Sequence, residues 1–171
     1  MSKTAPNMSK NIVVIGNGFA GSQAAVKLRN GMGKRGHKIT IVSPFDYCEV
    51  PMNMGKVLAC GKEDHEKALF PAMKETGIEY VIDSAKELTP SEVTTSNGTK
   101  VPFDLCIIAT GQSVPTFMPD ANGATTKEAR VHQVSAFHEK VVAAKNIVLS
   151  GGGPVGSETA ADIKLRFPDK M

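Results

Sequence analysis

The sequence predicts an α/β protein in which a parallel sheet lies between helices and a small antiparallel meander. The first observation is a pair of short β-branched apolar runs, each followed by a glycine-rich turn and an alanine-rich amphipathic stretch. This order is typical of a strand that leads into a covering helix. The second observation is a series of short strand-like runs around an Asn-Gly pair, which is typical of hairpins. The composition agrees, since 41% hydrophobic and 22% charged residues are ordinary for a globular domain.

The N-terminal elements predict a βαβ unit. Residues 11–15 predict a buried strand, residues 20 to about 30 a helix, and residues 38–42 a second buried strand. Gly31 and Gly33 are expected to end the helix in left-handed conformations. A right-handed crossover then places the two strands in one parallel sheet.

The middle of the chain changes character. Residues 45–66 contain one proline, two glycines and two cysteines without a clear period, so we expect a functional loop with short helical pieces. A helix is expected at about residues 65–76, with Gly77 at its end.

Short strands then predict an antiparallel meander. The Asn97-Gly98 pair is a strong signal for a two-residue hairpin turn. The strand at residues 104–108 is expected to return to the main sheet. The strands expected in the meander are residues 78–82, 85–88, 92–95 and 99–101.

The C-terminal part predicts a linker and a second strand–turn–helix junction. Residues 112–130 are rich in Pro, Gly and Thr, which is typical of a linker. Ser135 is expected to cap a helix that runs to Lys145. Residues 146–150 predict a strand, and the helix from about residue 154 to 166 opens with proline, which favours the first helical position.

Both junctions carry the pattern G-x-G-x-x-G, which is typical of dinucleotide binding when a strand precedes it and a helix follows it. The first glycine allows the tight turn, the second lets the backbone approach a pyrophosphate, and the third lets the helix pack on its strand. The pyrophosphate is then bound by the free N–H groups at the positive end of the helix. Two such sites imply two dinucleotides and suggest electron transfer between them. The glycines are Gly16, Gly18 and Gly21 in the first turn and Gly151, Gly153 and Gly156 in the second.

The order of these features resembles the two-dinucleotide flavoproteins of the pyridine nucleotide-disulphide oxidoreductase superfamily. The residues that carry the resemblance are GNGFAG at 16–21, IIATG at 107–111 and VLSGGGPVGSE at 148–158, and they extend it over nearly all of residues 10–168. Within the family the chain resembles the branch of apoptosis-inducing-factor-like and ferroptosis-suppressor-like enzymes and type II NADH dehydrogenases. The resemblance implies a Rossmann-like FAD/NAD(P)-binding fold, with FAD at the first turn and NADH or NADPH at the second. Electrons would pass from the flavin to a quinone, a disulphide or another acceptor.

The same resemblance implies a division of the chain. Residues 10–111 would be the N-terminal part of an FAD-binding domain, residues 112–145 a linker and helix, and residues 146–171 the incomplete start of an NAD(P)H-binding domain. We therefore expect a fragment or truncated member of the family, which by itself binds FAD weakly or not at all.

Site residues also follow from the resemblance. The amides of Phe19 and Ala20 would join the first three glycines around the FAD pyrophosphate, and Glu158 would orient the nicotinamide as the catalytic carboxylate. Further contacts to FAD would come from the flavin-bordering Thr110 and Gly111, from Pro51 near the flavin ring and from the Ala85 backbone at the adenine.

One residue departs from the family pattern. An acid that binds the ribose hydroxyls is expected at the end of the second strand, but Ser43 stands there. Serine can hydrogen-bond a ribose only weakly. This leaves open a phosphorylated dinucleotide at the first site, with Lys38 or Arg35 as its partner.

The cysteines leave one further alternative open. Cys48, Cys60 and Cys106 form no C-x₄-C pair, and such a sparse, odd set fits a reducing compartment. Cys48 lies where some relatives carry a single redox cysteine, so a Cys48-dependent disulphide reductase competes with an inert loop thiol. Cys106 is expected to be a core residue. The four histidines show no ligand spacing, so no metal is predicted.

Charge and hydropathy limit which partners and which compartment can be expected for the chain. A net charge of +3 gives no argument for nucleic acid, and no apolar run reaches eighteen residues. The polar N-terminus does not resemble a secretory signal. We expect a cytoplasmic protein with a quinone as its small-molecule acceptor, and peripheral membrane association stays open, as does the oligomeric state. A non-catalytic dinucleotide-binding module is the alternative from another class.

Overall fold

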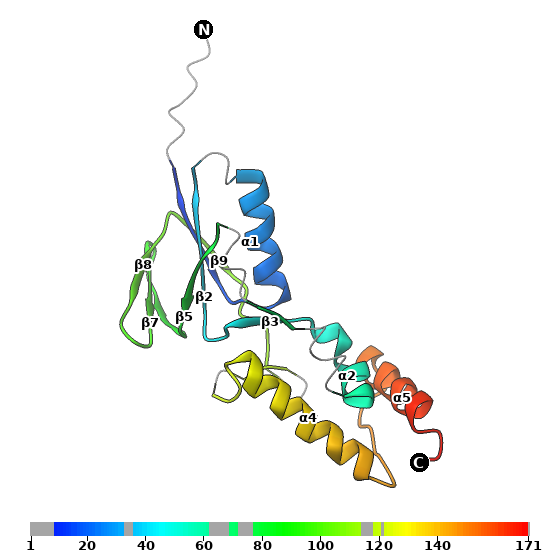
Figure 1. Cartoon of the computed structure of the whole chain (residues 1–171). Helices are drawn as coiled ribbons and strands as arrows, with labels where there is room; N and C mark the ends of the chain where they lie inside the picture. The colour runs from blue at the N-terminus through cyan, green and yellow to red at the C-terminus, as the bar shows by residue number, and fades with distance from the viewer. Residues whose placement is uncertain are drawn as a thin grey trace. The chain divides into compact units, whose positions relative to one another are not determined.

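A computed structural model of the chain describes residues 9–32, 36–61, 69–71, 77–113, 118–120 and 122–170 (Figure 1). The chain forms two compact units, and each is described by itself. Unit 1 comprises Met1–Cys48 and Ala72–Gly111, and unit 2 comprises Glu49–Pro71 and Gln112–Met171.

A four-stranded parallel sheet forms the centre of unit 1. Its order is β5-β2-β1-β9, and every neighbouring pair is parallel. The predicted βαβ unit is therefore confirmed, and β1 lies between two neighbours. The elements are β1 (Asn11–Ile15), α1 (Phe19–Met32), β2 (Lys38–Ser43), β5 (Glu79–Ile82) and β9 (Leu105–Ile108).

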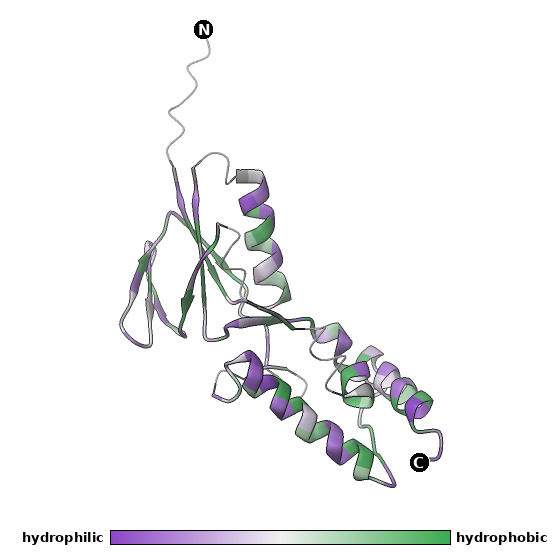
Figure 2. Cartoon of the chain, in the orientation of Figure 1, coloured by the Kyte–Doolittle hydropathy of each residue, from purple (hydrophilic) through white to green (hydrophobic). Residues whose placement is uncertain are grey.

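The two faces of this sheet bury different residues of β1, as the two-residue period of a strand requires. Ile12 and Val14 pack with Ala25 of α1 in one apolar cluster. Val13 and Ile15 pack in a second cluster with Val93 and other residues of the meander. Figure 2 shows hydrophobic residues along the strands of this sheet. The three layers predicted from the sequence are thus present.

The strand predicted at residues 78–82 belongs to the main sheet and not to the meander. β5 pairs with β2 in parallel, with Thr40 opposite Glu79. Ile78, just before β5, is 3% exposed and lies in the cluster under α1. Apolar alternation predicts a strand but cannot tell which sheet it joins, because its partner lies far away in the sequence.

The meander has three antiparallel strands, β6 (Ala85–Leu88), β7 (Glu92–Thr95) and β8 (Lys100–Pro102). The hairpin between β7 and β8 is confirmed, but its turn is one residue longer than predicted. Thr95 N donates to Thr99 O at 2.9 Å, so three residues connect the strands. Gly98 takes a φ of 82° at the third of them, as in a type I turn followed by a left-handed residue.

α1 ends later than predicted. Gly31 lies inside the last turn of the helix, and Gly33 lies outside the described residues. A glycine near a helix end is tolerated within the helix because the last turn loses little by its flexibility.

Unit 2 consists mainly of helices. α2 packs against both α4 and α5, and one apolar cluster joins Met54 and Leu58 of α2 to Val134 of α4. A short two-stranded sheet pairs β3 with β4. Of β3 (Tyr47–Glu49), only Glu49 belongs to unit 2. The other elements are η2 (Pro51–Asn53), α2 (Met54–Cys60), β4 (Leu69–Pro71), α4 (Lys127–Ala143) and α5 (Pro154–Arg166).

Two helix predictions in this region need correction. Leu69–Pro71 form strand β4 and not part of a helix, because pairing with β3 outweighs local propensity. The rest of the helix predicted at 65–76 lies outside the described residues. α4 begins at Lys127, where the Thr126 side chain caps it by accepting from Ala129 N at 3.2 Å. Ser135 is therefore an interior residue of α4 and not its cap.

Residues 146–150 do not form the strand predicted for them, whereas α5 spans the predicted residues. A strand exists only through pairing with a neighbour, and among the described residues none pairs with this segment. Val148 is 92% exposed as a result.

Candidate functional site

The first glycine turn connects β1 to α1 and passes between two other strands. Gly16 has a φ of 109°, and its N–H donates to Val42 O of β2 at 2.9 Å. A Cβ at this position would lie 2.3 Å from Ala109 O. Only glycine fits here, because both the backbone conformation and the space exclude a side chain.

The other two glycines differ in their surroundings. A Cβ on Gly21 would lie 2.0 Å from Gly16 O, so the helix packs directly on the turn. A Cβ on Gly18 would meet no atom within 4 Å of the described chain. The backbone at Gly18 is therefore open to a ligand. α1 begins at Phe19, and the N–H groups of its first turn have no partner within the helix.

Thr110 and Gly111 lie at the same turn. Thr110 Cα is 3.2 Å from the position of a Cβ on Gly16, and Gly111 has a φ of 67°. The carboxyl ends of β1 and β9 thus bring Thr110 next to the first glycine turn, whereas Pro51 and Ala85 lie elsewhere.

Ser43 ends β2 next to Val42, which binds Gly16. Its side chain is buried, and its Oγ accepts from Phe45 N at 3.3 Å. The hydroxyl proton remains to donate to a ligand. The position therefore offers one neutral hydrogen bond where an acid would offer a charged, bidentate acceptor.

Lys38 lies at the opposite end of β2. It pairs with Glu79 at 2.9 Å, and five strand residues at about 3.3 Å each place it roughly 16 Å from Ser43. This distance gives no support to Lys38 as a partner for a phosphate at the first turn. Arg35 lies outside the described residues.

Ala85 begins β6 and pairs with Thr95. The corner just before it is fixed by Asp83, whose carboxylate accepts from Ser84 N at 2.8 Å and from Asn97 N at 2.9 Å. A hydrogen bond from the Thr95 side chain, followed by the one from Asn97 N, lowers the pKa of Asp83 below 3.8. Sequence reasoning missed this carboxylate because its partners lie across the meander.

Cys48 lies in β3, with its side chain 8% exposed. Its Sγ is 3.3 Å from Ser22 Oγ, and the Ser22 hydroxyl donates to Phe19 O at 3.2 Å. In this contact the thiol and the hydroxyl can each be the donor. The Cys48 side chain is therefore buried and packed against Ser22. Cys106 is half-buried in β9, and burial raises the pKa of its thiol.

Asn17 is a further residue of the turn that sequence reasoning missed. Its side chain is 2% exposed, and Nδ2 donates to Tyr47 O at 3.1 Å. No sequence signal marks this contact, because the middle position of the motif accepts any residue type.

The second glycine turn repeats the local geometry of the first. Gly151 has a φ of 119°, a Cβ on Gly156 would lie 2.1 Å from Gly151 O, and a Cβ on Gly153 would meet nothing within 4 Å of the described chain. The difference lies around Gly151, where a Cβ would also find open space among the described residues.

Glu158 is the fifth residue of α5 and is exposed. It therefore lies in the second turn of the helix. Interaction with the helix dipole weakens beyond the first turn, so stabilisation of the helix is a weaker explanation for this carboxylate.

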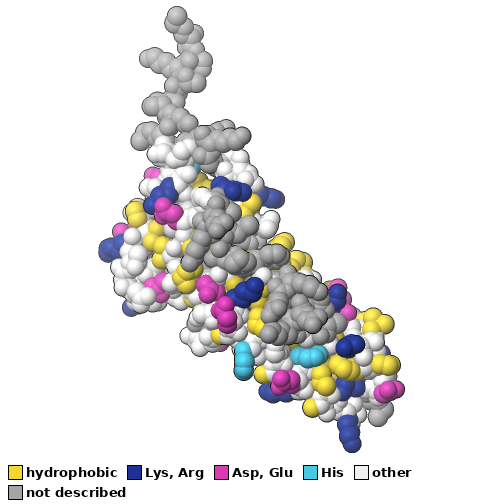
Figure 3. Space-filling model, in the orientation of Figure 1, with side chains coloured by type: hydrophobic (Ala, Val, Ile, Leu, Met, Phe, Trp, Pro, Cys, Tyr) yellow, Lys and Arg dark blue, Asp and Glu magenta, His cyan; other side chains and the backbone are white. Residues whose placement is uncertain are grey.

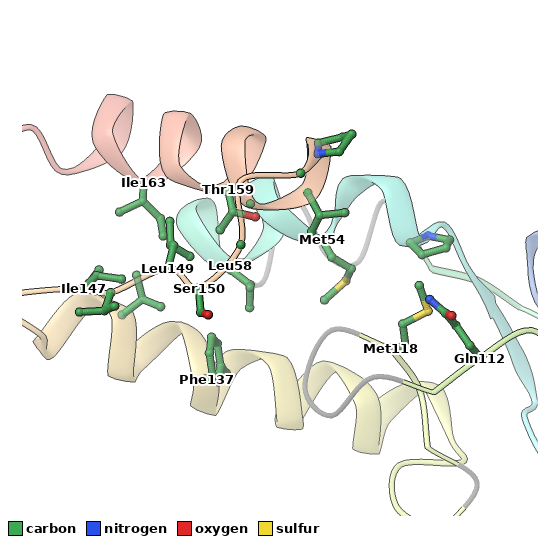
Figure 4. A pocket seen from close by; sticks show the side chains of 18 residues that line it. Met54, Leu58, Gln112, Met118, Phe137, Ile147, Leu149, Ser150, Thr159 and Ile163 are labelled. Carbon is green, nitrogen blue, oxygen red and sulfur yellow. The ribbon is translucent and has the colours of Figure 1, made fainter.

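A pocket of about 620 Å³ in unit 2 includes the second turn. It also includes Pro51, so the structure groups Pro51 with the second glycine motif. Figure 4 shows Phe137 pointing from α4 toward Ser150. Most of the lining is apolar: Met54, Leu58, Met118, Phe137, Val141, Ile147, Leu149, Val155 and Ile163.

α5 approaches α2 very closely beside this pocket. A Cβ on Gly55 would lie 2.8 Å from Thr159 Oγ1. Thr159 is 1% exposed, and its Oγ1 has no hydrogen-bond partner among the described residues. Gly55 and Thr159 thus fix the distance between the helix of the second turn and α2.

A buried ion pair precedes Pro51 in unit 2. Arg130 Nε lies 2.8 Å from Glu49 Oε2, and Arg130 Nη2 lies 2.9 Å from Glu49 Oε1. Their side chains are 0% and 2% exposed. The bidentate pair fastens the end of β3 to α4.

Within the described part of the chain, no group of His, Cys, Asp or Glu side chains is arranged to hold a metal ion. The helices of that part include none with the length and apolar character needed to cross a bilayer. On the face shown in Figure 3, basic and acidic side chains are interspersed.

Comparison with known proteins identifies what the chain is similar to. A sequence model of the pyridine nucleotide-disulphide oxidoreductase family matches residues 10–166. The ferroptosis suppressor protein 1 of Xenopus tropicalis is 26% identical over 99% of this chain and 44% of its own length. The oxidoreductase ptaL of Pestalotiopsis fici is 28% identical over 92% of this chain and 46% of its own length. The chain thus spans less than half of these relatives.

Solved structures show a similar fold. The sulfide:quinone oxidoreductase of Aquifex aeolicus has a TM-score of 0.67 at 25% identity, over 94% of this chain and 41% of that one. Putidaredoxin reductase, in its covalent complex with putidaredoxin, has a TM-score of 0.68 at 21% identity, over 95% of this chain and 40% of that one. The predicted fold is therefore confirmed.

Proposed function

This chain belongs to the pyridine nucleotide-disulphide oxidoreductase family, and on that premise we propose that it is the cofactor-binding part of a flavin-dependent NAD(P)H oxidoreductase. FAD is bound at the first glycine turn and NADH or NADPH at the second. The bound flavin supplies hydride acceptance and onward electron transfer. The chain's own residues bind and orient the two dinucleotides.

The observation that carries this proposal is the geometry around Gly16 and Gly18. The turn is closed against Ala109 behind Gly16 and open in front of Gly18. An open backbone at the start of a helix presents N–H groups and a positive dipole to an anion. A pyrophosphate fits this cradle, and Thr110 and Gly111 follow the cofactor along the sheet edge.

At the second turn, the open backbone at Gly153 supports the same role toward the NAD(P)H pyrophosphate. Glu158 orients the nicotinamide, and its exposure in the second turn of α5 leaves the carboxylate accessible to a ligand. Pro51 borders this pocket in unit 2.

A quinone is the electron acceptor that we propose. One supporting fact is that a sulfide-quinone reductase of Aquifex aeolicus is 35% identical over 61% of this chain and 25% of its own length. Quinones dissolve in membranes, so a cytoplasmic protein that acts at a membrane surface fits this proposal.

The test is a fluorescence titration of FAD with the wild-type chain and with Gly18→Val. We expect weak, saturable quenching by the wild-type chain and at least a tenfold loss of affinity in Gly18→Val, because the new side chain fills the space above the turn. Riboflavin, which lacks phosphates, serves as the control ligand. Equal affinity of both proteins for FAD would overturn the proposal.

A second candidate is a dinucleotide-binding module without catalysis. The open surroundings of Gly151 favour it, because within the described part of the chain no strand packs against the second turn as β2 and the end of β9 do against the first. FAD binding without NADH oxidation under the same conditions would support this module over the enzyme.

A further inference from the structure

The first glycine turn is attached to the chain before Pro51 by two side-chain contacts. Asn17 Nδ2 donates to Tyr47 O at 3.1 Å, and Ser22 Oγ contacts Cys48 Sγ at 3.3 Å. Tyr47 and Cys48 are neighbours in β3, and both contacts are buried. We call Asn17, Ser22, Tyr47 and Cys48 the turn clamp.

Among the described residues, no such clamp holds the second glycine turn, which therefore provides an internal comparison. The two junctions align with a constant difference of 135 residues, from Asn11 with Asn146 onward. Gly152 then corresponds to Asn17 and has no side chain. Ser157 corresponds to Ser22, but its Oγ donates to Gly152 O of its own turn at 3.4 Å. The clamp is therefore separable from the glycine motif itself.

We infer that the turn clamp preorganises the first turn for a pyrophosphate, with Asn17 as a positioning residue that does not touch the ligand. The inference rests on the proposed function, because it assumes a dinucleotide at this turn. A turn built from glycines has many accessible backbone conformations. Fixing it before binding removes an entropic cost that the ligand would otherwise meet.

The geometry also predicts which part of a ligand is affected. Asn17 lies between Gly16 and Gly18 and precedes the amides that would contact phosphate oxygens. Loss of the clamp should therefore weaken FAD and ADP by the same factor and leave adenosine unchanged. One buried hydrogen bond corresponds to a loss of about three- to tenfold.

The experiment compares wild type, Asn17→Gly and Asn97→Gly in titrations with FAD, ADP and adenosine. Asn17→Gly gives the first turn the residue that the second turn already has. Asn97→Gly is the matched control, since it makes the same change at an exposed residue that uses its backbone N–H in the meander. Equal losses for all three ligands, or no loss for ADP, would overturn the inference.

A measurement without any ligand keeps the two proposals separate. Gly16 N and Ser22 N are the hydrogen-bonded amides that flank the open turn, with Val42 O and Gly18 O as their acceptors. Their hydrogen exchange should be at least about threefold faster in Asn17→Gly than in wild type, because the clamp limits local opening. Unchanged exchange overturns the clamp, even where FAD binds. If wild type binds neither FAD nor ADP, the proposed function fails, whereas faster exchange still supports the clamp.

Cys48 gives a second pair of variants. Cys48→Ser keeps a hydrogen-bonding group opposite Ser22, and Cys48→Ala removes it. We expect ADP affinity to be retained in Cys48→Ser and reduced in Cys48→Ala. A loss in both variants would contradict the role of this contact in the clamp.

Discussion

Individual residues decide what the first turn can do. Gly16 and Gly18 stand two positions apart in one motif, yet their surroundings are opposite. Gly16 is enclosed by Ala109 and Thr110, which follow β9, and Gly18 is open. We therefore assign Gly16 to the stability of the fold and Gly18 to the proposed ligand, and substitutions at the two positions can separate these effects.

Gly16→Ala should destabilise the chain far more than Gly18→Ala. The new Cβ at position 16 would lie 2.3 Å from a backbone oxygen and would adopt a positive φ, which costs at least about 2 kcal/mol. At position 18 nothing blocks the side chain. Urea denaturation of both variants measures the difference, and equal midpoints would contradict this account.

Asp83→Asn should lower stability at neutral pH and have a smaller effect in acid. Hydrogen bonds, of which the one from the Thr95 side chain has the largest effect, keep the pKa of Asp83 below 3.8 in the folded chain. Its contribution is thus complete above 3.8 and is lost as the pH falls through the lowered folded value. Urea midpoints at pH 7 and pH 3 test this. A loss of urea midpoint in Asp83→Asn that is larger at pH 3 than at pH 7 would contradict this prediction.

At the scale of elements, the sequence predicts β1, α1, β2 and α5 because each carries a local signal. A strand before a glycine turn and a proline at the first helical position are such signals. Two predictions were wrong. β4 was predicted as part of a helix but pairs with β3, and β5 was assigned to the meander but pairs with β2. In both cases the partner strand lies elsewhere in the chain.

The same reason explains which contacts were missed. Asn17 binds a carbonyl 30 residues away, and Arg130 pairs with a carboxylate 81 residues away. Residue type alone does not indicate a partner at such separations. The two glycine turns were predicted because the G-x-G-x-x-G spacing between a strand and a helix is a local signal in the sequence.

Glu49→Gln should destabilise unit 2 strongly. It removes the negative charge that Glu49 places against Arg130, whose side chain is 0% exposed, and breaking such a buried pair costs about 3–5 kcal/mol. Glu92→Gln is the control, because its partner Lys100 is exposed and solvent screens that pair. Chemical denaturation should show a large loss for the first variant only. Similar losses in both would contradict the role of burial.

At the scale of the whole molecule, the two junctions share one local geometry and differ in what surrounds them. β1 has strand neighbours on both sides. Residues 146–150 pair with no strand among the described residues, and Val148 is 92% exposed where the corresponding Val13 is 1% exposed. The first junction thus has a strand that is paired on both sides, whereas the second has its turn and helix α5 but no paired strand among the described residues.

Amide hydrogen exchange should reveal this difference directly. Residues 12–14 form ladder bonds on both edges of β1, so their exchange should be at least about tenfold slower than that of residues 147–149. Exchange of the whole chain, read by NMR or mass spectrometry, gives both values in one experiment. Equal protection of the two segments would mean that residues 146–150 are paired in solution.

The central claim is that the first glycine turn binds a dinucleotide through its pyrophosphate. The most direct measurement is a titration of the isotope-labelled chain with FAD, followed by backbone amide chemical shifts. The account predicts that the largest shifts occur at residues 18–21, with smaller ones at Thr110 and Gly111. Saturable FAD binding that leaves these amides unmoved would contradict it.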